Sequence, residues 1–190
     1  LDVYIDEIEN NIYNLIYEIN LGPKAKIKKI TFTGDKIFKD SKLKNIIVSE
    51  EYKPWKFISG KKYLNEKVIE FDKKLLSNFY LNKGFYNVKI NTSFAKLIKN
   101  ESFELIFNIN ANKKFFFDQL SLELPSDFDA SNYEDIIELF NELKGQPYSF
   151  NRIEKILNSI DSISTNEQFM SVKSSVVENI IDNKINLKFV

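Results

Sequence analysis

The sequence predicts an α+β chain with two small modules in tandem, each in the order strand, helix, helix, strand, strand. Apolar residues that alternate with period two mark the strands, and apolar residues three and four positions apart mark the helices. The same order appears twice at a spacing of roughly 80–90 residues, which is too long for a solenoid repeat and typical of tandem small domains. Helices grouped between strands favour a three-stranded sheet covered on one face by two helices.

The first 23 residues are predicted to form a hairpin rather than a module. Two strand-like segments, 1–8 and 12–21, are joined by a short turn. Gly22 and Pro23 then interrupt the pattern. Because a lone hairpin is at best marginally stable in water, we expect residues 1–23 to be the end of a preceding domain.

Residues 24–111 are predicted to form the first complete module. Asp40 or Ser41 is the expected N-cap of its short helix, and Gly84 the residue that ends its longer one. We expect Phe79, on the apolar stripe of the longer helix, to be a core residue whose replacement by Ala costs about 3–5 kcal/mol. The predicted elements are a strand at 25–33, a helix at 41–48, an aromatic loop at 49–62, a helix at 65–83, and strands at 86–97 and 103–109. The predicted stripe of the longer helix is Val68, Phe71, Leu75, Leu76 and Phe79.

Residues 112–190 are predicted to repeat the order. Ser131 is the expected cap of the first helix, which ends at Gly145, and Asp182–Asn183 is the expected turn between the last two strands. The predicted elements are a strand at 115–124, helices at 133–143 and 151–163, and strands at 169–177 and 184–190.

Composition limits the kinds of function the chain can have. Hydrophobic residues make up 43% of its 190 positions, enough to fill compact cores. The absence of Cys and His removes the thiolate and imidazole chemistry of most nucleophiles, proton shuttles and metal sites. The 27 basic and 27 acidic residues cancel, whereas a phosphate-binding protein usually has a basic surplus. We therefore predict that the chain is not an enzyme, binds no nucleic acid, and needs no cofactor or metal.

No apolar run approaches the roughly 20 residues of a transmembrane helix. The chain opens at Leu1 directly in strand-like sequence, without a signal-peptide pattern. We expect it to be a fragment of a longer polypeptide.

Two acidic features have both a functional and a structural interpretation. Asp72 lies on the apolar face of the longer helix, where it could act as a general acid or base or could accept hydrogen bonds from a nearby loop. Without a partner acid, His or metal cluster, the structural interpretation is favoured. Asp127 and Asp129 lack the ligand number that calcium requires and are interpreted as a helix-entry loop.

Several short sequence patterns occur at characteristic places in this order of elements. The first group is a glycine at a domain junction, followed by a strand and the start of a helix. The others are an aromatic loop between two helices, a helix that ends before Gly-Phe-Tyr, and a Gly-x-x-Tyr motif. Their residues are Ile19–Pro23, Ile27–Gly34, Phe38–Leu43, Trp55–Gly60, Asp72–Tyr86 and Gly145–Tyr148. Together they resemble the tandem POTRA domains of the BamA family, which assembles β-barrel proteins into outer membranes.

The resemblance implies a periplasmic scaffold segment, part of an outer-membrane protein, that meets the membrane only through a C-terminal barrel outside this sequence. Residues 1–23 would be the end of a POTRA2-like domain, residues 24–111 POTRA3-like and residues 112–190 POTRA4-like. Thr165–Phe169 departs from the family pattern, because Gly-Tyr is expected before the second outer strand.

The resemblance also implies hinges between domains, at Gly22 and Pro23 and at Ala111 and Asn112. The last two residues replace the usual Glu-Gly of the family. Because Asn can adopt the left-handed conformation that Gly would supply, the second hinge is expected to survive the change.

In this family the first strand of the closing hairpin is a sheet edge, which corresponds here to residues 87–97. The resemblance implies that an unfolded outer-membrane client adds to this edge as a further strand. A BamB-like lipoprotein and other assembly subunits are the further implied partners. Trp55 and Phe57 are either an exposed contact for that lipoprotein or the lid of the module's own core. The implied edge residues are Asn87, Val88, Lys89, Ile90, Asn91, Thr92, Ser93 and Phe94.

Two alternative functions stay open. The closer one is the POTRA segment of a related secretion or import pore. The more distant one is a KH-like nucleic-acid binder, because Gly60–Lys62 lies where that fold places its G-x-x-G loop. The second Gly is missing and the net charge is zero, which argues against nucleic acid.

Overall fold

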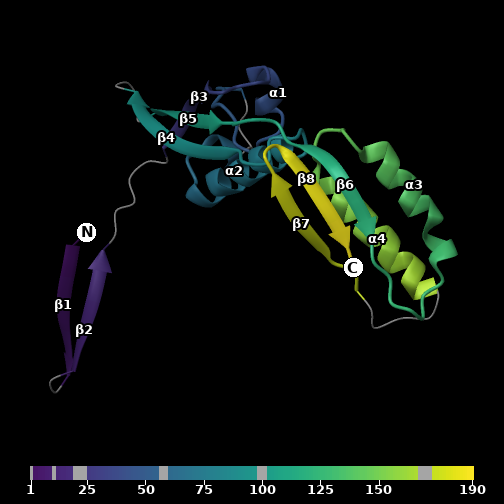
Figure 1. Cartoon of the computed structure of the whole chain (residues 1–190). Coiled ribbons are helices and arrows are strands. Elements are labelled where there is room, and N and C mark those ends of the chain that lie inside the picture. Colours follow the sequence, from purple (N-terminus) through teal and green to yellow (C-terminus); the bar gives the residue numbers. More distant parts are fainter. Residues whose placement is uncertain (1, 10–11, 19–24, 56–59, 98–101, 167–172) are drawn as a thin grey trace.

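The computed structural model describes residues 2–9, 12–18, 25–55, 60–97, 102–166 and 173–190. Its strands form three separate sheets, with the orders β1-β2, β3-β5-β4 and β6-β8-β7 (Figure 1). The second and third sheets each carry helices and are called the first and second module. The elements are β1 (Asp2–Glu9), β2 (Ile12–Glu18), β3 (Lys26–Gly34), α1 (Asp40–Lys44), the 3-10 turn η1 (Gly60–Lys62), α2 (Glu66–Leu81), β4 (Lys89–Leu97), β5 (Ser102–Asn110), β6 (Phe116–Leu122), the 3-10 turn η2 (Ala130–Tyr133), α3 (Glu134–Leu143), α4 (Phe150–Asn166), β7 (Val176–Ile181) and β8 (Lys184–Phe189). The α+β class and the element order of both modules are as predicted.

Strands β1 and β2 form the predicted antiparallel hairpin. Val3 pairs with Tyr17 and Ile5 with Leu15, which places these four apolar side chains on one face. Each of the four is more than half exposed. The face thus has the character of a sheet surface that helices would cover in a complete domain.

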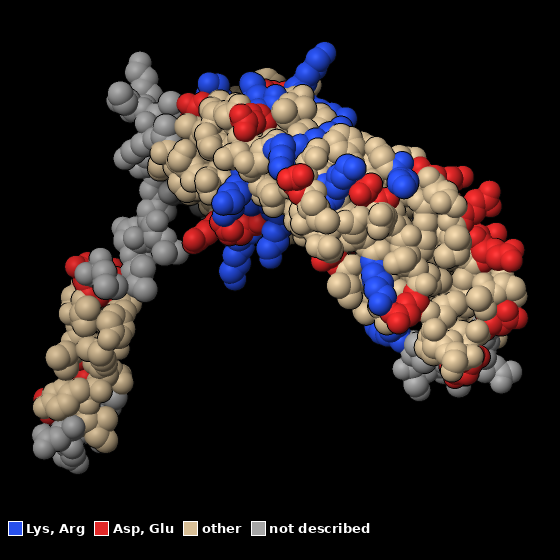
Figure 2. All heavy atoms as spheres, viewed as in Figure 1, with Lys and Arg blue, Asp and Glu red and all other residues tan. Residues whose placement is uncertain are grey.

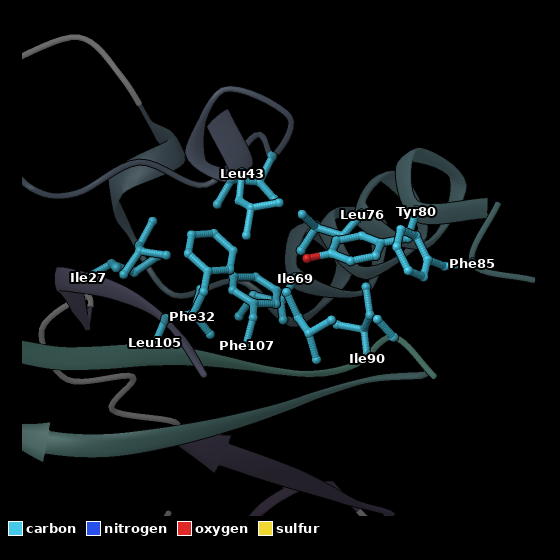
Figure 3. Packing of buried hydrophobic residues seen from close by; sticks show 14 residues of the cluster. Ile27, Phe32, Leu43, Ile69, Leu76, Tyr80, Phe85, Ile90, Leu105 and Phe107 are labelled. Carbon is cyan, nitrogen blue, oxygen red and sulfur yellow. The ribbon is translucent and has the colours of Figure 1, made fainter. Parts of the chain in front are cut away.

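In the first module, β5 lies between β3, to which it is parallel, and β4, to which it is antiparallel. Period-two alternation sends Ile30 and Phe32 of β3 into the core, where Phe32 stacks on Phe107 at 5.5 Å between ring centroids. Leu43 of α1 and Leu76 of α2 close over these side chains (Figure 3). One continuous cluster therefore joins all the main elements of this module.

Helix α1 is shorter than predicted, and its predicted cap is wrong. Its N-cap is Lys39, with no capping side chain, and Asp40 forms an ion pair with Lys36 at 2.9 Å between Nζ and Oδ1. At the other end, the backbone N–H groups of Val48 and Ser49 donate to the Asp72 carboxylate. This competing acceptor draws residues 45–49 out of helical geometry.

Helix α2 begins where predicted, after Asn65, whose side chain caps it by accepting the N–H of Val68 at 3.3 Å, and it is followed by Gly84 at φ +94°. Asp72 lies on the buried face as predicted, but the rest of the stripe differs from the prediction, because Ile69 and Tyr80 belong to it and Phe71 is half exposed. Phe79 lies at the rim of the core against Phe38, at 4.8 Å between ring centroids. A loss smaller than the predicted 3–5 kcal/mol therefore follows for Phe79→Ala. The buried residues of α2 are Ile69, Asp72, Leu76 and Tyr80.

The second module repeats the topology, with β8 between a parallel β6 and an antiparallel β7. The predicted Ser131 cap is wrong: Asp129 precedes η2, and its carboxylate accepts from the N–H and the hydroxyl of Ser131. In α3, Ile136 and Phe140 are buried, whereas Ile137, which the apolar spacing also places on the buried face, is 44% exposed. The turn at Asp182, with φ +58°, is as predicted. Strand β7 begins later than predicted, at Val176, and residues 169–172 of the prediction lie outside the described part of the chain.

Candidate partner-binding site

The predicted edge strand is an edge of the first sheet, since β4 pairs only with β5 in the strand order β3-β5-β4. Lys89, Asn91 and Ser93 are exposed and lie on the face opposite the helices. Ile90 is buried in the core, while Phe94, on the same face as Ile90, is 48% exposed. Of the remaining predicted residues, Asn87 and Val88 precede β4, and Thr92 within it is half-buried.

The opposite edge of this sheet is covered. The inter-helix loop (residues 45–65, described except for 56–59) runs along the outer side of β3. The Glu51 carboxylate accepts the N–H of Ile30 at 3.0 Å, and the N–H of Tyr52 donates to the carbonyl of Ile27 at 2.7 Å. Leu64 likewise donates to the carbonyl of Ala25. In the described part of the chain, no backbone hydrogen bond of this kind meets the outer side of β4, so β4 is the open edge.

The charge of Glu51 suits its role in this loop. Burial opposes ionisation, but hydrogen bonds from Lys44 and from the N–H of Ile30 outweigh it and lower the pKa of Glu51. The ion pair with Lys44, at 2.5 Å between Nζ and Oε1, ties the loop to α1.

Asp72 anchors the start of the inter-helix loop from within the core. Its side chain is fully buried, and it accepts the N–H of Val48 at 2.5 Å and that of Ser49 at 3.2 Å. A buried carboxylate is tolerated because backbone donors replace its water. The structural interpretation of Asp72 is confirmed.

The second module has the same division into one covered and one open edge. The inter-helix segment (residues 144–149) pairs with β6: the N–H of Gly145 donates to the carbonyl of Phe117 at 2.8 Å, and the N–H of Phe117 donates to that of Gln146 at 2.9 Å. Strand β7 is the open edge. Its Val177 and Ile181, on the face opposite the helices, are 58% and 56% exposed.

Sequence analysis missed β7 as an edge. The signal was the β-branched run Val-Val-Glu-Asn-Ile-Ile at 176–181. The predicted strand, 169–177, ended before most of that run. The two open edges therefore differ in character, one polar and one apolar.

The aromatic loop is described only in part. Trp55 is 71% exposed, which supports an exposed position rather than a core lid for this side chain. Phe57 lies outside the described residues.

The predicted second hinge lies in a contact region between the modules. Ala111 is fully buried, and Asn112 adopts the left-handed conformation with φ +57°. The Asn112 side-chain amide donates to the carbonyl of Asn87 at 2.8 Å. Gly22 and Pro23, the first predicted hinge, lie outside the described residues.

Asn82, the C-cap residue that follows α2, also caps the N-terminus of α4 in the second module. Its Oδ1 accepts the N–H of Asn151 at 2.8 Å and the hydroxyl of Ser149 at 3.0 Å. Backbone donors at a helix N-terminus otherwise lack partners. The end of one module's helix therefore satisfies the start of the next module's helix.

A second polar contact joins the modules on Glu178 of β7. The hydroxyl of Tyr86, from the first module, donates to Oε2 at 2.7 Å, and that of Tyr148 donates to Oε1 at 3.1 Å. The hydrogen bond to Glu178, followed by burial, raises the pKa of Tyr86 to about 12. Burial and the Glu178 charge raise the pKa of Tyr148 as well.

No helix in the described ranges is long and apolar enough to cross a membrane. Within those ranges, no group of three or more acidic residues is placed to hold a metal ion.

Comparison with known proteins identifies the first module. The POTRA family model, described as "Surface antigen variable number repeat", matches residues 25–112. The outer membrane protein assembly factor BamA of Buchnera aphidicola (subsp. Acyrthosiphon pisum, strain APS) is 24% identical over 181 residues, which cover 93% of this chain and 28% of the relative. The chain thus spans less than a third of that relative's length.

Solved structures share the fold of both modules. The structure of Haemophilus influenzae BamA POTRA3-5 aligns with a TM-score of 0.61 at 17% identity, over 90% of this chain and 68% of that one. Haemophilus ducreyi BamA lacking POTRA domains 1-3 also aligns with a TM-score of 0.61, at 9% identity, over 86% of this chain and 28% of that one.

Proposed function

We propose that this chain, whose residues 25–112 match the POTRA family model and which is similar to BamA over most of its length, is a periplasmic scaffold segment of an outer-membrane β-barrel assembly protein. In this proposal residues 1–23 end a second POTRA domain, residues 24–111 form a third, and residues 112–190 a fourth. The proposal rests on one observation: the β4 edge of the first sheet is open, whereas the opposite edge, β3, is covered.

We propose that an unfolded client adds to β4 as a fourth strand. The nine residues of β4 offer main-chain donors and acceptors, which can pair with an added strand largely independently of its sequence. Such pairing suits clients of many sequences. The exposed Lys89, Asn91 and Ser93 discourage two copies from pairing edge to edge. Phe94, half exposed beside the core, offers an apolar contact to alternate side chains of the added strand.

The expected affinity is low. About five main-chain hydrogen bonds, at about 1 kcal/mol each, barely exceed the roughly 4 kcal/mol or more lost on association. Weak and transient binding suits a scaffold that passes its clients on.

The test is a titration of the chain with a peptide from a barrel strand, followed through backbone amide chemical shifts. We expect shifts along residues 89–97 that keep growing with peptide concentration through the millimolar range, because a net gain of about 1 kcal/mol corresponds to a Kd well above about 1 mM. Two control peptides keep every side chain and carry N-methyl groups on one or the other set of alternate backbone amides. Only one of the two should lose binding, because an edge strand uses one set of amides.

Two results would contradict edge addition at β4. Equal binding by both N-methylated peptides would show that side chains, not the ladder, hold the peptide. Shifts confined to β7 would indicate that the peptide binds instead at the apolar edge of the second module.

The exposed Trp55 is the proposed contact for a BamB-like accessory lipoprotein. Because it is the single Trp of the chain, its fluorescence reports on that surface directly when a Trp-free lipoprotein is used. We expect a blue shift of the emission on binding, and weaker binding for Trp55→Ala. Ile37→Ala, at another exposed apolar residue of the module, is the matched control and should bind normally. If Trp55 emission stayed unchanged at saturating lipoprotein, Trp55 would not be part of the contact.

A further inference from the structure

A hollow between the two modules is lined by basic and neutral polar side chains. It measures about 450 Å³ and lies where the end of α2 meets the start of α4. Both modules contribute to it, so it exists only when they are in contact. Its lining residues are Asn82, Lys83, Lys114, Pro147, Ser149, Asn151, Arg152 and Lys155.

The four cations of the hollow are not neutralised by ion pairs among the described residues, although Glu142 lines a neighbouring pocket together with Arg152 and Lys155. In the described part of the chain, none of them forms an ion pair with a carboxylate. Arg152 donates to the neutral amide of Gln146, and Lys114 lies over the ring of Phe85 at 5.9 Å from Nζ to the centroid. Like charges gathered without a counter-ion repel one another, and an anion placed among them relieves that repulsion.

The fold brings Lys114 to the hollow through Gly84. A Cβ added at Gly84 would come within 2.9 Å of Cγ of Lys114, so the missing side chain leaves room for the lysine stem. Lys114 thereby crosses from the second module to the end of α2. The hollow is thus a product of close packing at the junction rather than of lysines scattered on a surface.

The zero net charge of the chain conceals a strong separation between its modules. Residues 24–111 contain nineteen basic and nine acidic residues, whereas residues 112–190 contain eight basic and thirteen acidic ones. Figure 2 shows basic side chains over the first module and acidic ones along the far rim of the second. The first module, with a surplus of ten positive charges, attracts anions toward the junction.

We propose that this junction hollow binds a phosphate monoester or inorganic phosphate. Four cations exceed the single charge of a carboxylate, while a phosphate monoester carries nearly two negative charges and three acceptor oxygens near pH 7. The side chain of Asn151 adds a polar group to the hollow, and the dipole of α4 adds positive potential there, while the N–H groups of its first turn already donate to Asn82 and Ser149. The proposal stands independently of client binding at β4.

Binding would also stabilise the contact between the modules. Asn82 both lines the hollow and caps α4, and the lining cations come from both modules, Lys83 from the first and the other three from the second. An anion held among them attracts the modules toward each other. A bound phosphate group is therefore expected to reduce motion between them.

The test is a titration of the whole 190-residue chain with sodium phosphate at pH 7, against sodium acetate at matched ionic strength. We expect saturable amide shifts at Asn82, Lys83 and Asn151 with phosphate, and at least about fivefold weaker binding for Lys83→Gln/Lys155→Gln. The control variant Lys67→Gln/Lys74→Gln removes the same charge from exposed positions of α2 outside the hollow and should stay within about twofold of the parent chain. Lys67 lies about 20 Å along α2 from its end.

Three results would overturn the site. Acetate could shift the same amides equally, the hollow variant could bind phosphate like the parent, or the control variant could weaken binding as much as the hollow variant. Saturation by polyglutamate together with no response to phosphate would replace the proposal with an acidic protein segment.

Vesicles separate the two sources of the phosphate group. Sedimentation with vesicles containing phosphatidic acid, but not with phosphatidylcholine alone, and its loss in Lys83→Gln/Lys155→Gln would support a lipid headgroup. Saturable binding of inorganic phosphate without sedimentation would support a soluble phosphate. If neither probe binds, the hollow is not a phosphate site.

Discussion

The two modules cover the outer edge of their first strand in different ways. In the first module a long inter-helix loop does so through backbone hydrogen bonds from Tyr52 and Leu64 and through the Glu51 carboxylate, while Asp72 holds the start of the loop. In the second module the short segment 144–149 does so through backbone hydrogen bonds to β6. Both covers therefore use the backbone, but the long loop also relies on two carboxylates.

The largest expected effect is at Asp72. Asp72→Ala would leave the N–H groups of Val48 and Ser49 buried without an acceptor and should lower the free energy of unfolding of the first module by about 2–4 kcal/mol. Denaturant unfolding followed by amide signals of each module measures this. Asp72→Asn keeps one acceptor oxygen and should lose less. Equal stability of Asp72→Ala and the parent chain would show that the loop is held in another way.

The contact on Glu178 tests whether the modules unfold together. Glu178→Ala removes the acceptor of two tyrosine hydroxyls and should cost about 1–2 kcal/mol, with the unfolding transitions of the two modules moving apart. Tyr86→Phe removes one of the two hydrogen bonds and should have a smaller effect. Transitions that stay coincident in Glu178→Ala would mean that other contacts couple the modules.

The pH dependence of this contact has a defined sign. Since the pKa of Tyr86 is raised from 10 to about 12, the neutral hydroxyl is the form that the folded chain favours. Its contribution to stability is fully present below pH 10 and is lost as the pH rises through about 12. Tyr86→Phe should flatten the stability profile in this window.

In the second module the matching test of the edge cover is Gly145. The residue has φ +77°, and an added Cβ meets no atom within 4 Å, so Gly145→Ala introduces backbone strain alone. We expect a loss of about 1 kcal/mol in the free energy of unfolding. A much larger loss would mean that the short segment has less freedom to adjust than its open surroundings indicate.

The smallest effect is expected at the buried tyrosines. The Tyr80 hydroxyl points into the core of the first module (Figure 3), where the backbone N–H of Ile37 is near it but no described group makes a hydrogen bond of ordinary geometry with it. Tyr133 of the second module, equally buried, meets the Ser164 hydroxyl at 3.1 Å. Tyr80→Phe should therefore be neutral or slightly stabilising, while Tyr133→Phe should cost about 1 kcal/mol, as measured by thermal melts. Equal losses at both positions would reveal a partner for Tyr80.

Sequence patterns predicted the fold well wherever an element has one clear physical determinant. Asn65 and Gly84 fixed the ends of α2 in this way, and alternation in β5 identified its buried face. The predictions at Asp40 and Ser131 were wrong because a neighbouring charged residue displaces each expected cap. Lys36 pairs with Asp40, and Asp129 rather than Ser131 supplies the carboxylate that caps η2. Local sequence does not show which competitor wins.

The candidate site was predictable only in part. The edge position of β4 followed from the family resemblance. The covered edges, the cap from Asn82 to α4 and the junction hollow all depend on residues far apart in the chain. The net charge of the whole chain also masked the basic surplus of the first module, because the residues outside that module carry an equal acidic surplus.

In each module the first and last strands along the chain are parallel, and this determines how far the module carries the chain. Lys26 lies beside Ser102 and Gly34 beside Ile109, so the chain enters the first module at one end of the sheet and leaves it at the other. Nine residues of strand at about 3.3 Å each carry it forward by about 30 Å. The second module repeats the step with β6 and β8. An array of such modules works as a spacer whose length is set by their number, and inserting or deleting one would change the distance between the two ends of the array without altering how any single module folds.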